Sequence, residues 1–329
     1  MKEILNKLFS SYLLSKQEAK SILLSLGKGE FDPIQIASFL TVFNLRSITV
    51  DELAGFREAM LELCIRVNLS DFDAVDIVGT GGDGKDTFNI STTSALVVAG
   101  AGYKVAKHGN YGVSSSCGSS NVLEYLGVKF SSNQDTLKKA LDVAGFCMMH
   151  APLFHPAMKY VAPVRKAMQV RTFFNILGPM INPSFPKKHA HGVFNLATLR
   201  LYAYQHNQTT DTFKIIHALD GYDEISLTSD TKVYSNKGEF LYSPKDLGFN
   251  KLAQKDLWGG STIEESAKIL SCIIEGKGTE AQQNAVLANA SMAITVADSS
   301  LSFTEAKAKA KESIDSGNAK LVLSKLLSL

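Results

Sequence analysis

The sequence predicts an α/β protein with a small all-helical N-terminal domain and a large α/β domain, in which helices flank a mostly parallel central sheet. Three observations predict it. Apolar residues follow helical spacing alone up to about residue 70, short strand-like apolar runs then alternate with helical segments, and a glycine-rich loop, Gly79–Gly84, follows the first such run. We place the helical domain at residues 1–72 and the α/β domain at 73–329.

The N-terminal part contains three well-marked helices. Residues 17–29 have apolar residues at helical spacing and end in glycines, and residues 50–64 carry one apolar helical face. Between them, Asp32 and Pro33 form a helix start, with Asp as N-cap and Pro at the first position, and apolar residues continue to Val42.

The remaining chain alternates strands and helices, which favours a parallel sheet. Strands are expected at residues 74–78, 102–109, 146–150, 191–195 and 213–221, with a hairpin at 231–242. Helices are expected at residues 95–102, 119–127, 134–145, 155–169 and throughout about 262–329, with a break near Pro163.

Composition narrows the class of protein. The net charge is only +2, from 34 basic and 32 acidic residues, so a nucleic-acid partner is not expected. The longest apolar stretch, 95–102, is far shorter than the roughly 20 residues that cross a bilayer, so no membrane partner is expected either. No secretion signal is evident at the N-terminus, and the four cysteines are isolated, which together favour a cytoplasmic protein.

The loop Gly79-Thr80-Gly81-Gly82-Asp83-Gly84 is the strongest local signal. Glycines allow positive φ angles and let successive backbone N–H groups surround an anion, which suits a pyrophosphate. The spacing fits neither the ATP-binding GxxxxGK[ST] pattern nor the dinucleotide-binding GxGxxG pattern. A tight strand-to-helix turn without a ligand remains the alternative.

Two more polar segments follow strands. Asn89, Ser91 and Thr92 precede a helix, where they either cap it or bind phosphate with the free N–H groups. Lys107-His108-Gly109-Asn110 and the serines after it form either a polar surface loop or a second phosphate- and ribose-binding loop. Because ligands of open α/β sheets gather beyond the carboxyl ends of the strands, we expect both segments to lie near the glycine loop.

Acidic and basic residues suggest further ligand contacts. Asp223 and Glu224 follow an apolar strand and are either Mg²⁺ ligands or part of a solvated turn. Arg165 suits a carboxylate, which arginine holds through two parallel hydrogen bonds, although a surface charge is the alternative. The pair His189 and His191 has no third ligand nearby in the sequence, so we do not predict a metal site there.

Taken together, these segments resemble the anthranilate phosphoribosyltransferase family. The shared motifs occur in the family's order over most of the chain: GTGGD (79–83), NIST (89–92), KHGN (107–110), SSxxGSxxVLExLG (114–127), HPAMKYVxPVR (155–165), RTxFNxLGPxxNP (171–183) and DE (223–224). The resemblance implies a homodimer, Mg²⁺ as cofactor, and phosphoribosyl pyrophosphate (PRPP) and anthranilate as substrates. It also implies that the helical domain gains a mid-chain contribution near 155–185.

The resemblance assigns roles residue by residue. Catalytic positions are Lys107, Asn110 and Arg165. Metal-binding positions are Ser91, Asp223 and Glu224. Substrate-binding positions are Gly79, Gly82, Asp83, Thr87, Asn89, Ile90, Ser91, Thr92, Lys107, His108, Gly109, Asn110, Ser114, Ser115, Ser119, Arg165 and Pro179. The chain departs from the family pattern at Tyr111, at Ser116-Cys117 and at Met168-Gln169, where the family often has Arg, Lys-Ser and Leu-Gly.

The resemblance implies transfer of the phosphoribosyl group of PRPP to anthranilate, a step of tryptophan biosynthesis. Two other functions stay open from the sequence. A pyrimidine nucleoside phosphorylase has a similar fold, but it uses free phosphate and does not need the Asp223-Glu224 pair. A nucleic-acid-binding relative without catalytic activity is disfavoured by the near-neutral charge.

Overall fold

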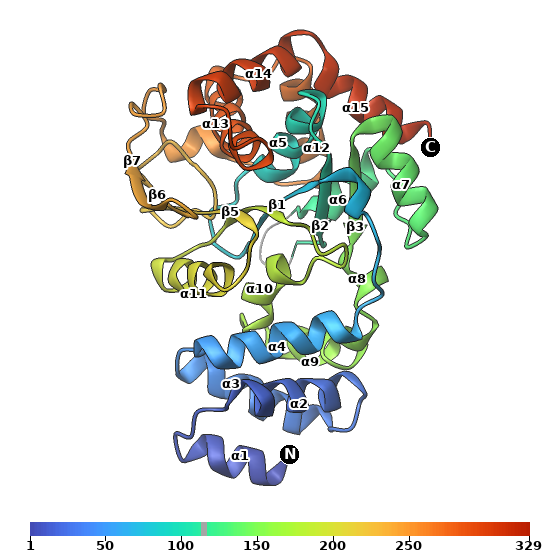
Figure 1. Ribbon diagram of the computed structural model, residues 1–329, viewed down its shortest axis with the longest axis vertical. Helices are drawn as coiled ribbons and strands as arrows, with labels where there is room; N and C mark the ends of the chain where they lie inside the picture. Colours follow the sequence, from blue (N-terminus) through green and yellow to red (C-terminus); the bar gives the residue numbers. More distant parts are fainter. Residues whose placement is uncertain (113–116) are drawn as a thin grey trace. The chain divides into compact units, whose positions relative to one another are not determined.

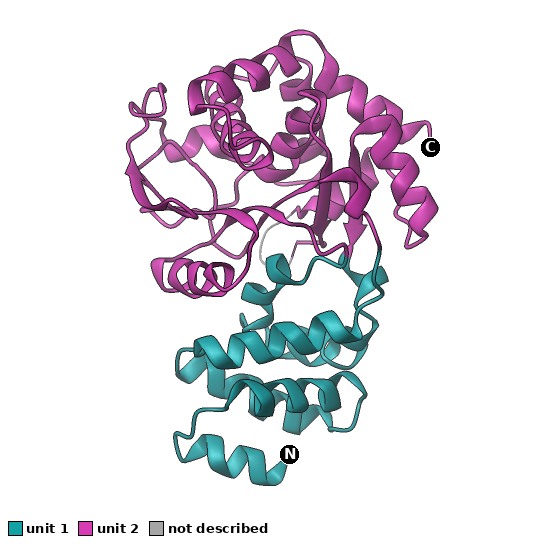
Figure 2. Ribbon diagram, in the orientation of Figure 1, with its two compact units in different colours: residues 1–67, 151–183 teal, residues 68–150, 184–329 magenta. Residues whose placement is uncertain are grey.

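The computed structural model describes residues 1–112 and 117–329 and confirms the predicted fold class. The described chain divides into two compact units, which Figure 2 colours separately. The smaller unit combines residues 1–67 with 151–183, and the larger combines 68–150 with 184–329. Among the described residues, none of the helices has the length and apolarity that a membrane crossing requires.

The smaller unit is entirely helical (Figure 1). Its N-terminal helices are α1 (Lys2–Phe9), α2 (Lys16–Gly27), α3 (Pro33–Leu45) and α4 (Val50–Leu63), and its mid-chain helices are α8 (Ala151–Phe154), η2 (Pro156–Tyr160), α9 (Ala162–Met168), α10 (Phe174–Leu177) and η3 (Gly178–Ile181). The sequence analysis does not mark helix α1 separately, because it spans only eight residues; Leu8 on it is buried and Phe9 is exposed.

Capping and aromatic packing explain the smaller unit. Ser15, Asp32 and Thr49 form capping boxes at the starts of α2, α3 and α4. Gly55 lets α4 approach α2, since a Cβ there would lie 2.2 Å from the Lys16 carbonyl oxygen. The mid-chain segment joins the same core through Phe173, whose ring stacks on that of Phe56 from α4 at a centroid distance of 4.4 Å.

Glu52 on α4 is a buried carboxylate that ties three segments together. It accepts hydrogen bonds from Arg46 (2.5 and 2.9 Å), from the backbone N–H of Leu14 (3.0 Å) and from that of Thr49 (2.9 Å). Burial alone would raise the pKa of Glu52, but these hydrogen bonds lower it below its ordinary value. The ionised carboxylate therefore stabilises the fold above the ordinary glutamate pKa, and acidification removes that contribution.

We expect Glu52→Gln to lower the free energy of unfolding by about 3 kcal/mol, because it leaves Arg46 without its anionic partner. Glu58→Gln, on the same helix but in an exposed pair with Lys16, is the matched control and should change stability by less than about 1 kcal/mol. Urea unfolding followed by circular dichroism measures both. Equal effects of the two variants would contradict the importance assigned to Glu52.

The larger unit is built on a seven-stranded sheet in the order β3-β2-β1-β4-β5-β6-β7. The strands are β1 (Val75–Gly79), β2 (Val105–Gly109), β3 (Phe146–His150), β4 (Lys188–Gly192), β5 (Thr212–Ala218), β6 (Thr231–Ser235) and β7 (Gly238–Tyr242). Pairing is parallel from β3 through β5, and β6 and β7 are antiparallel. The predicted hairpin is thus confirmed, whereas the predicted strand at 191–195 in fact begins at Lys188.

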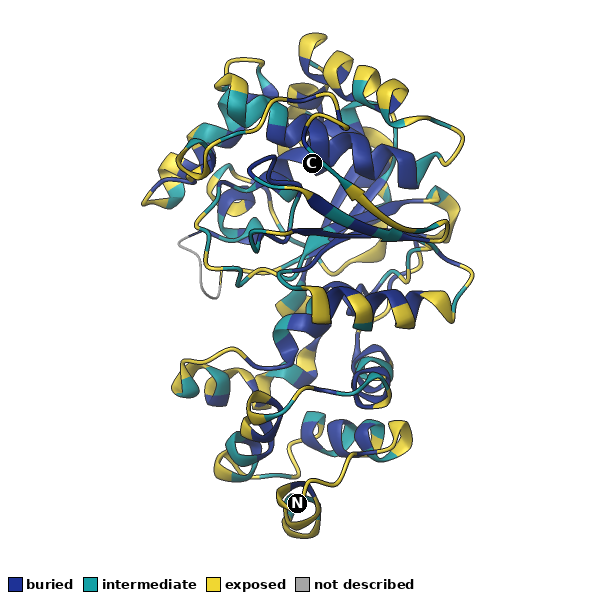
Figure 3. Ribbon diagram, turned by 90° about the vertical axis from the view of Figure 1, so that its left-hand side faces the viewer, coloured by how far each residue is buried: buried dark blue, intermediate teal, exposed yellow. Residues whose placement is uncertain are grey.

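Helices cover both faces of this sheet (Figure 1). They are η1 (Ser70–Phe72), α5 (Ile90–Gly100), α6 (Ser119–Tyr125), α7 (Gln134–Ala144), α11 (Leu196–Asn207), η4 (Gln254–Leu257), α12 (Ile263–Ile274), α13 (Glu280–Ala297), α14 (Phe303–Asp315) and α15 (Asn318–Leu327). Helices α5 and α13 pack on β1, and α11 packs on β5 and β6 across the opposite face. Figure 3 shows the buried residues gathered in the sheet and in the helices next to it.

Helix α11 is a second element that the sequence analysis does not predict. Its sequence, LATLRLYAYQHN, mixes polar and apolar residues without a clear apolar face. Even so, Tyr202 and His206 are buried against the sheet.

Two strands that end beside one another, β1 and β4, carry Gly79 and Gly192 in register at their carboxyl ends, and this edge positions the candidate site.

Candidate active site

The glycine loop lies against the acidic pair. Gly81, Gly82 and Gly84 all have positive φ angles, between 64° and 73°, as the glycine content predicts. The backbone N–H of Gly81 donates a 2.7 Å hydrogen bond to Asp223 Oδ2. A Cβ on Gly79 would lie 2.3 Å from that same oxygen, so glycine is required for the carboxylate to approach the end of β1.

Three carboxylates gather at this point. Asp223 is buried, and burial together with the charge of Asp83 raises its pKa to about 7. Burial and the charges of Asp223 and Asp83 likewise raise the pKa of Glu224 well above its ordinary value. Carboxylates that repel one another in this way form a site for a divalent cation, because a bound cation removes the repulsion.

Lys107 on β2 lies close enough to the carboxylates for its positive charge to oppose the rise in the pKa of Glu224. Its side chain is 1% exposed, and Nζ donates hydrogen bonds to the Ile77 carbonyl oxygen (2.5 Å) and to Ser91 Oγ (3.3 Å). Burial lowers the pKa of Lys107 to about 8, although Asp76, Glu224 and Asp223 oppose that shift. Lys107 therefore remains mostly protonated at pH 7.

The start of α5 completes this arrangement. The backbone N–H of Ser91 donates a 2.9 Å hydrogen bond to Glu224 Oε1. The N-cap residue is Asn89, and no side chain caps the helix, so the hydroxyls of Ser91 and Thr92 are not used for capping. Within the described residues, the buried Thr92 Oγ1 and Glu224 Oε2 have no hydrogen-bond partner. The start of α5 thus ties its Ser91 N–H to Glu224 and carries the Thr92 hydroxyl, to which no described group is bonded.

Asn110, at the start of the second predicted loop, is held by α6. The carbonyl oxygen of Asn110 accepts hydrogen bonds from Ser119 Oγ (3.3 Å) and from the Ser120 N–H (3.1 Å). The side chain of Asn89 reaches the same region, since its Nδ2 donates to the Cys117 carbonyl oxygen at 3.0 Å. Tyr111, which replaces the arginine common in the family, instead places its hydroxyl 3.2 Å from both carboxylate oxygens of Glu124.

The remaining predicted positions divide by location. Gly82, Thr87, Ile90, His108 and Gly109 lie in the same loops and strand ends, and Thr87 forms a β-bridge with Trp258. Arg165 and Pro179 belong to the smaller unit, where Arg165 Nη2 donates a 3.2 Å hydrogen bond to Asn175 Oδ1. The guanidinium of Arg165 also lies 5.5 Å from the Phe174 ring centroid. Ser114 and Ser115 lie outside the described residues.

Two residues that sequence reasoning missed position the acidic pair. Asn289 on α13 exchanges two hydrogen bonds of 2.9 Å with the backbone N–H and carbonyl oxygen of Ile225, the residue after Glu224. Gly192 at the end of β4 leaves room for the backbone of Asp223, since a Cβ there would lie 1.5 Å from the Asp223 carbonyl oxygen. The only sequence signals were a buried amide in an alanine-rich helix and a glycine at a strand end.

Comparisons with known proteins identify the family. Residues 2–64 of this chain match the helical bundle domain of the glycosyl transferase family, and residues 71–320 match the a/b domain of that family. The anthranilate phosphoribosyltransferase of Flavobacterium psychrophilum is 57% identical over 100% of this chain and 99% of its own length, and that of Bacteroides fragilis is 49% identical over the same shares. This chain belongs to the anthranilate phosphoribosyltransferase family.

Solved structures agree with the assignment to the anthranilate phosphoribosyltransferases. The enzyme from Thermus thermophilus superposes with a TM-score of 0.91 at 34% identity, covering 98% of both chains. The enzyme from Saccharomyces cerevisiae in complex with PRPP and Mg superposes with a TM-score of 0.90 at 28% identity, covering 98% of this chain and 96% of that one. The predicted class, a glycosyltransferase, is confirmed.

The raised pKa of Asp223 predicts how pH affects the metal-free protein. The carboxyl group of Asp223 holds its proton more tightly in the folded protein, where its pKa is about 7, than in the unfolded chain, where the pKa is near 4. Its contribution to stability is therefore fully present below about pH 4 and is lost as the pH rises to about 7. Wild type should therefore lose stability relative to Asp223→Asn across this interval when a chelator is present, and millimolar Mg²⁺ should reduce the loss. Chemical unfolding at several pH values measures the difference, and parallel curves for the two proteins would contradict it.

Proposed function

We propose that this chain transfers the phosphoribosyl group of PRPP to anthranilate, giving N-(5-phosphoribosyl)anthranilate and pyrophosphate, in tryptophan biosynthesis. The observation that carries the proposal is the meeting of Asp83, Asp223 and Glu224 with Lys107 beside a glycine loop and a helix N-terminus. This is a site for a metal-bound diphosphate, and full-length relatives named for this reaction support the choice of substrates.

The residues present fit Mg²⁺. Asp223 and Glu224 offer hard oxygen ligands, Glu224 Oε2 is buried without a hydrogen-bond partner in the described part of the chain, and Ser91 Oγ lies next to them, within 3.3 Å of Lys107 Nζ. When bound there by Ser91, Asp223 and Glu224, Mg²⁺ neutralises charge on the pyrophosphate group. A yeast relative solved in complex with PRPP and Mg supports the choice of Mg²⁺ as the ion.

The chain's own residues hold the diphosphate in place. Gly82 and Asp83 of the loop and residues 89–92 at the start of α5 contact the phosphate oxygens, and the ammonium of Lys107 offsets their charge. Thr87, Gly109 and Ser119, together with Ser114 and Ser115, contact the rest of PRPP. As the bond between ribose C1 and the pyrophosphate oxygen breaks, these groups stabilise the negative charge that develops on the leaving group.

Anthranilate is placed by its carboxylate and its ring. We assign carboxylate binding to Arg165 and Asn110, and contacts with the ring to the backbone of Gly79, to His108 and to Pro179. The neutral arylamine attacks C1 from the face opposite to the pyrophosphate, and the new C–N bond forms as the C–O bond breaks. The nitrogen then releases one proton. No base stronger than water is needed, so positioning supplies most of the rate enhancement.

A fluorescence assay of anthranilate consumption tests this function. We expect consumption only when PRPP and Mg²⁺ are both present, and we expect no phosphorolysis of uridine or thymidine. Consumption that continues without PRPP would contradict the proposal, and nucleoside cleavage by free phosphate would favour the phosphorylase reaction instead.

We expect Arg165→Ala to raise the KM for anthranilate about tenfold or more while changing the KM for PRPP by less than about threefold, because a charge-assisted hydrogen bond contributes roughly 1.5–3 kcal/mol. Lys166→Ala, an exposed neighbour on the same helix, is the control and should leave both constants unchanged. Steady-state kinetics with each substrate varied in turn gives both values. Equal rises in the two KM values would count against the assignment of Arg165.

We also infer that two copies associate through the smaller unit and that the enzyme works in the cytoplasm. Large apolar side chains are exposed on that unit: Phe9, Leu13, Ile34 and Leu45. All four cysteines of the chain are free thiols, as in a reducing compartment. Light scattering should give twice the mass of one chain, and Leu45→Lys should shift the protein toward the monomer; a monomeric wild type would overturn the inference.

A further inference from the structure

A buried cluster of histidine and aspartate side chains lies on the face of the sheet that α11 covers, and the proposed reaction does not use it. Its members are Asp76 on β1, His189 and His191 on β4, His206 on α11, and Asp211 just before β5. Each is at most 6% exposed. His189 and His191 are two residues apart in a strand, so their side chains share one face, and Asp76 is the register partner of His189 on the neighbouring strand.

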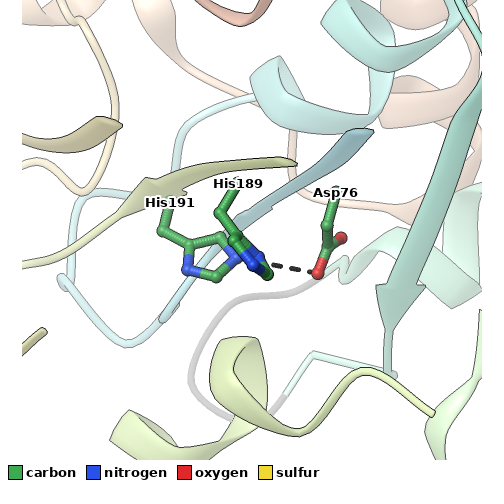
Figure 4. Close-up of side chains that lie close together, drawn as sticks. All are labelled: Asp76, His189 and His191. Carbon is green, nitrogen blue, oxygen red and sulfur yellow. Dashed lines mark ion pairs between the residues drawn. The ribbon is translucent and has the colours of Figure 1, made fainter. Parts of the chain in front are cut away.

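Asp76, His189 and His191 bring potential metal ligands together (Figure 4). One ligand atom of each lies within 4.8 Å of the other two. His191 Nε2 is 3.6 Å from Asp76 Oδ2. Two ligands of one tetrahedral zinc ion are about 3.3 Å apart, given bond lengths near 2.05 Å, so His191 Nε2 and Asp76 Oδ2 are already close to coordination distance. The sequence shows no third ligand beside the two histidines because the sheet supplies it from another strand.

The surroundings of His189 and Asp76 match those of metal ligands. His189 Nε2 is 3.2 Å from Asp211 Oδ2, and within the described residues the buried Nδ1 of His189 has no hydrogen-bond partner. A histidine that donates one ring N–H to a carboxylate and keeps the other nitrogen for the ion is the usual pattern at zinc sites. On Asp76, Oδ1 accepts a 3.4 Å hydrogen bond from the His108 N–H, so Oδ2 is the oxygen nearer to His191.

We propose that this cluster binds one Zn²⁺ ion or a similar divalent transition-metal ion, with Asp76, His189 and His191 as ligands and Asp211 orienting His189. Two imidazoles and one carboxylate suit such ions, whereas Mg²⁺ prefers oxygen ligands. The ion joins β1 to β4, the two strands that end in Gly79 and Gly192 beside Asp223. It therefore stabilises the sheet beneath the candidate active site and takes no part in the reaction.

Zinc titration of the full chain tests the proposal. The protein is treated with a chelator, dialysed, and titrated with Zn²⁺ against a chromogenic chelator in the presence of millimolar Mg²⁺, which occupies the acidic pair. We expect one equivalent to bind with a Kd below about 1 µM, a rise in the melting temperature, and the visible absorption of tetrahedral Co²⁺ when Co²⁺ replaces Zn²⁺. A wild type that binds no Zn²⁺ under these conditions would show a metal-free hydrogen-bond network and overturn the proposal.

Variants locate the ion. His191→Gln should weaken Zn²⁺ binding at least about a hundredfold, and Asp211→Asn should weaken it about 10- to 100-fold. His217→Gln changes a buried histidine on β5 whose Nδ1 lies 2.9 Å from the Val193 carbonyl oxygen, and it should bind Zn²⁺ as wild type does. Glu224→Gln should also retain binding. Full binding by His191→Gln, or its loss in Glu224→Gln, would overturn the proposal; if a cluster variant fails to fold, the wild-type Co²⁺ spectrum still decides.

Discussion

Glu224→Gln is expected to lower kcat/KM for PRPP at least about a hundredfold, while the protein keeps its fold. The amide retains an oxygen that accepts the Ser91 N–H, now 2.9 Å from Oε1, but removes one of the charges that bind the metal. Losing one preorganised electrostatic contact to a transition state commonly costs about 10²–10³ in rate. Because repulsion among the three carboxylates also falls, the metal-free variant should be at least as stable as wild type.

The control for Glu224→Gln is Asp220→Asn in the same turn. The carboxylate of Asp220 accepts hydrogen bonds from the hydroxyls of Thr228 (2.5 Å) and Ser229 (2.7 Å) and is not one of the three carboxylates of the candidate metal site. This variant should retain kcat/KM within about threefold, at a modest cost in stability. Steady-state assays over a range of Mg²⁺ concentrations measure both proteins. Should Glu224→Gln keep wild-type activity and Mg²⁺ dependence, the acidic pair would not be the metal site.

Gly192→Ala is expected to be the most damaging single-methyl change at the site. The new Cβ would lie 1.5 Å from the carbonyl oxygen of Asp223 and 2.6 Å from its carbonyl carbon. Both are backbone atoms, so no rotamer change relieves the overlap, and the acidic turn must move. Overpacking usually costs about 1–3 kcal/mol, and a clash with the backbone should reach or exceed the upper value. We therefore expect both a lower melting temperature and a loss of activity of at least about a hundredfold.

Gly178→Ala is the matched change at a glycine with space around it. Gly178 has a right-handed helical conformation, and apart from its chain neighbours no described atom lies within 4 Å of the added Cβ. Because Pro179 follows, and proline disfavours the helical conformation of a preceding residue that has a Cβ, a small loss of stability is expected. Calorimetry should therefore show a clearly smaller drop in melting temperature for Gly178→Ala than for Gly192→Ala. A fully stable and active Gly192→Ala would mean that the acidic turn does not depend on the close approach of β4.

The sequence predicted the parts of the site that follow strands directly. The glycine loop follows β1, Lys107 lies near the end of β2, and Asp223 and Glu224 follow β5; the strand-end rule for parallel sheets places all three together. The sequence also located α2 to α4, because their caps and apolar spacing are local signals. These predictions needed no knowledge of which strands are neighbours.

Features that depend on strand order were out of reach. The sequence gives no sign that β4 inserts beside β1, so neither the role of Gly192 nor the meeting of Asp76 with His189 is visible in it. Helix α11 escaped prediction because its buried face includes tyrosine, glutamine and histidine rather than aliphatic residues alone. Asn289 looks like any polar residue of a long helix until its two hydrogen bonds to Ile225 are seen.

A crystal structure with PRPP and Mn²⁺ in place of Mg²⁺ tests the central claim most directly, since the anomalous scattering of Mn²⁺ locates the metal. We predict a manganese peak beside Asp223 and Glu224, with the diphosphate held between the loop at Gly79–Gly84 and the start of α5, within reach of Lys107. A metal peak and diphosphate bound away from these residues would contradict it.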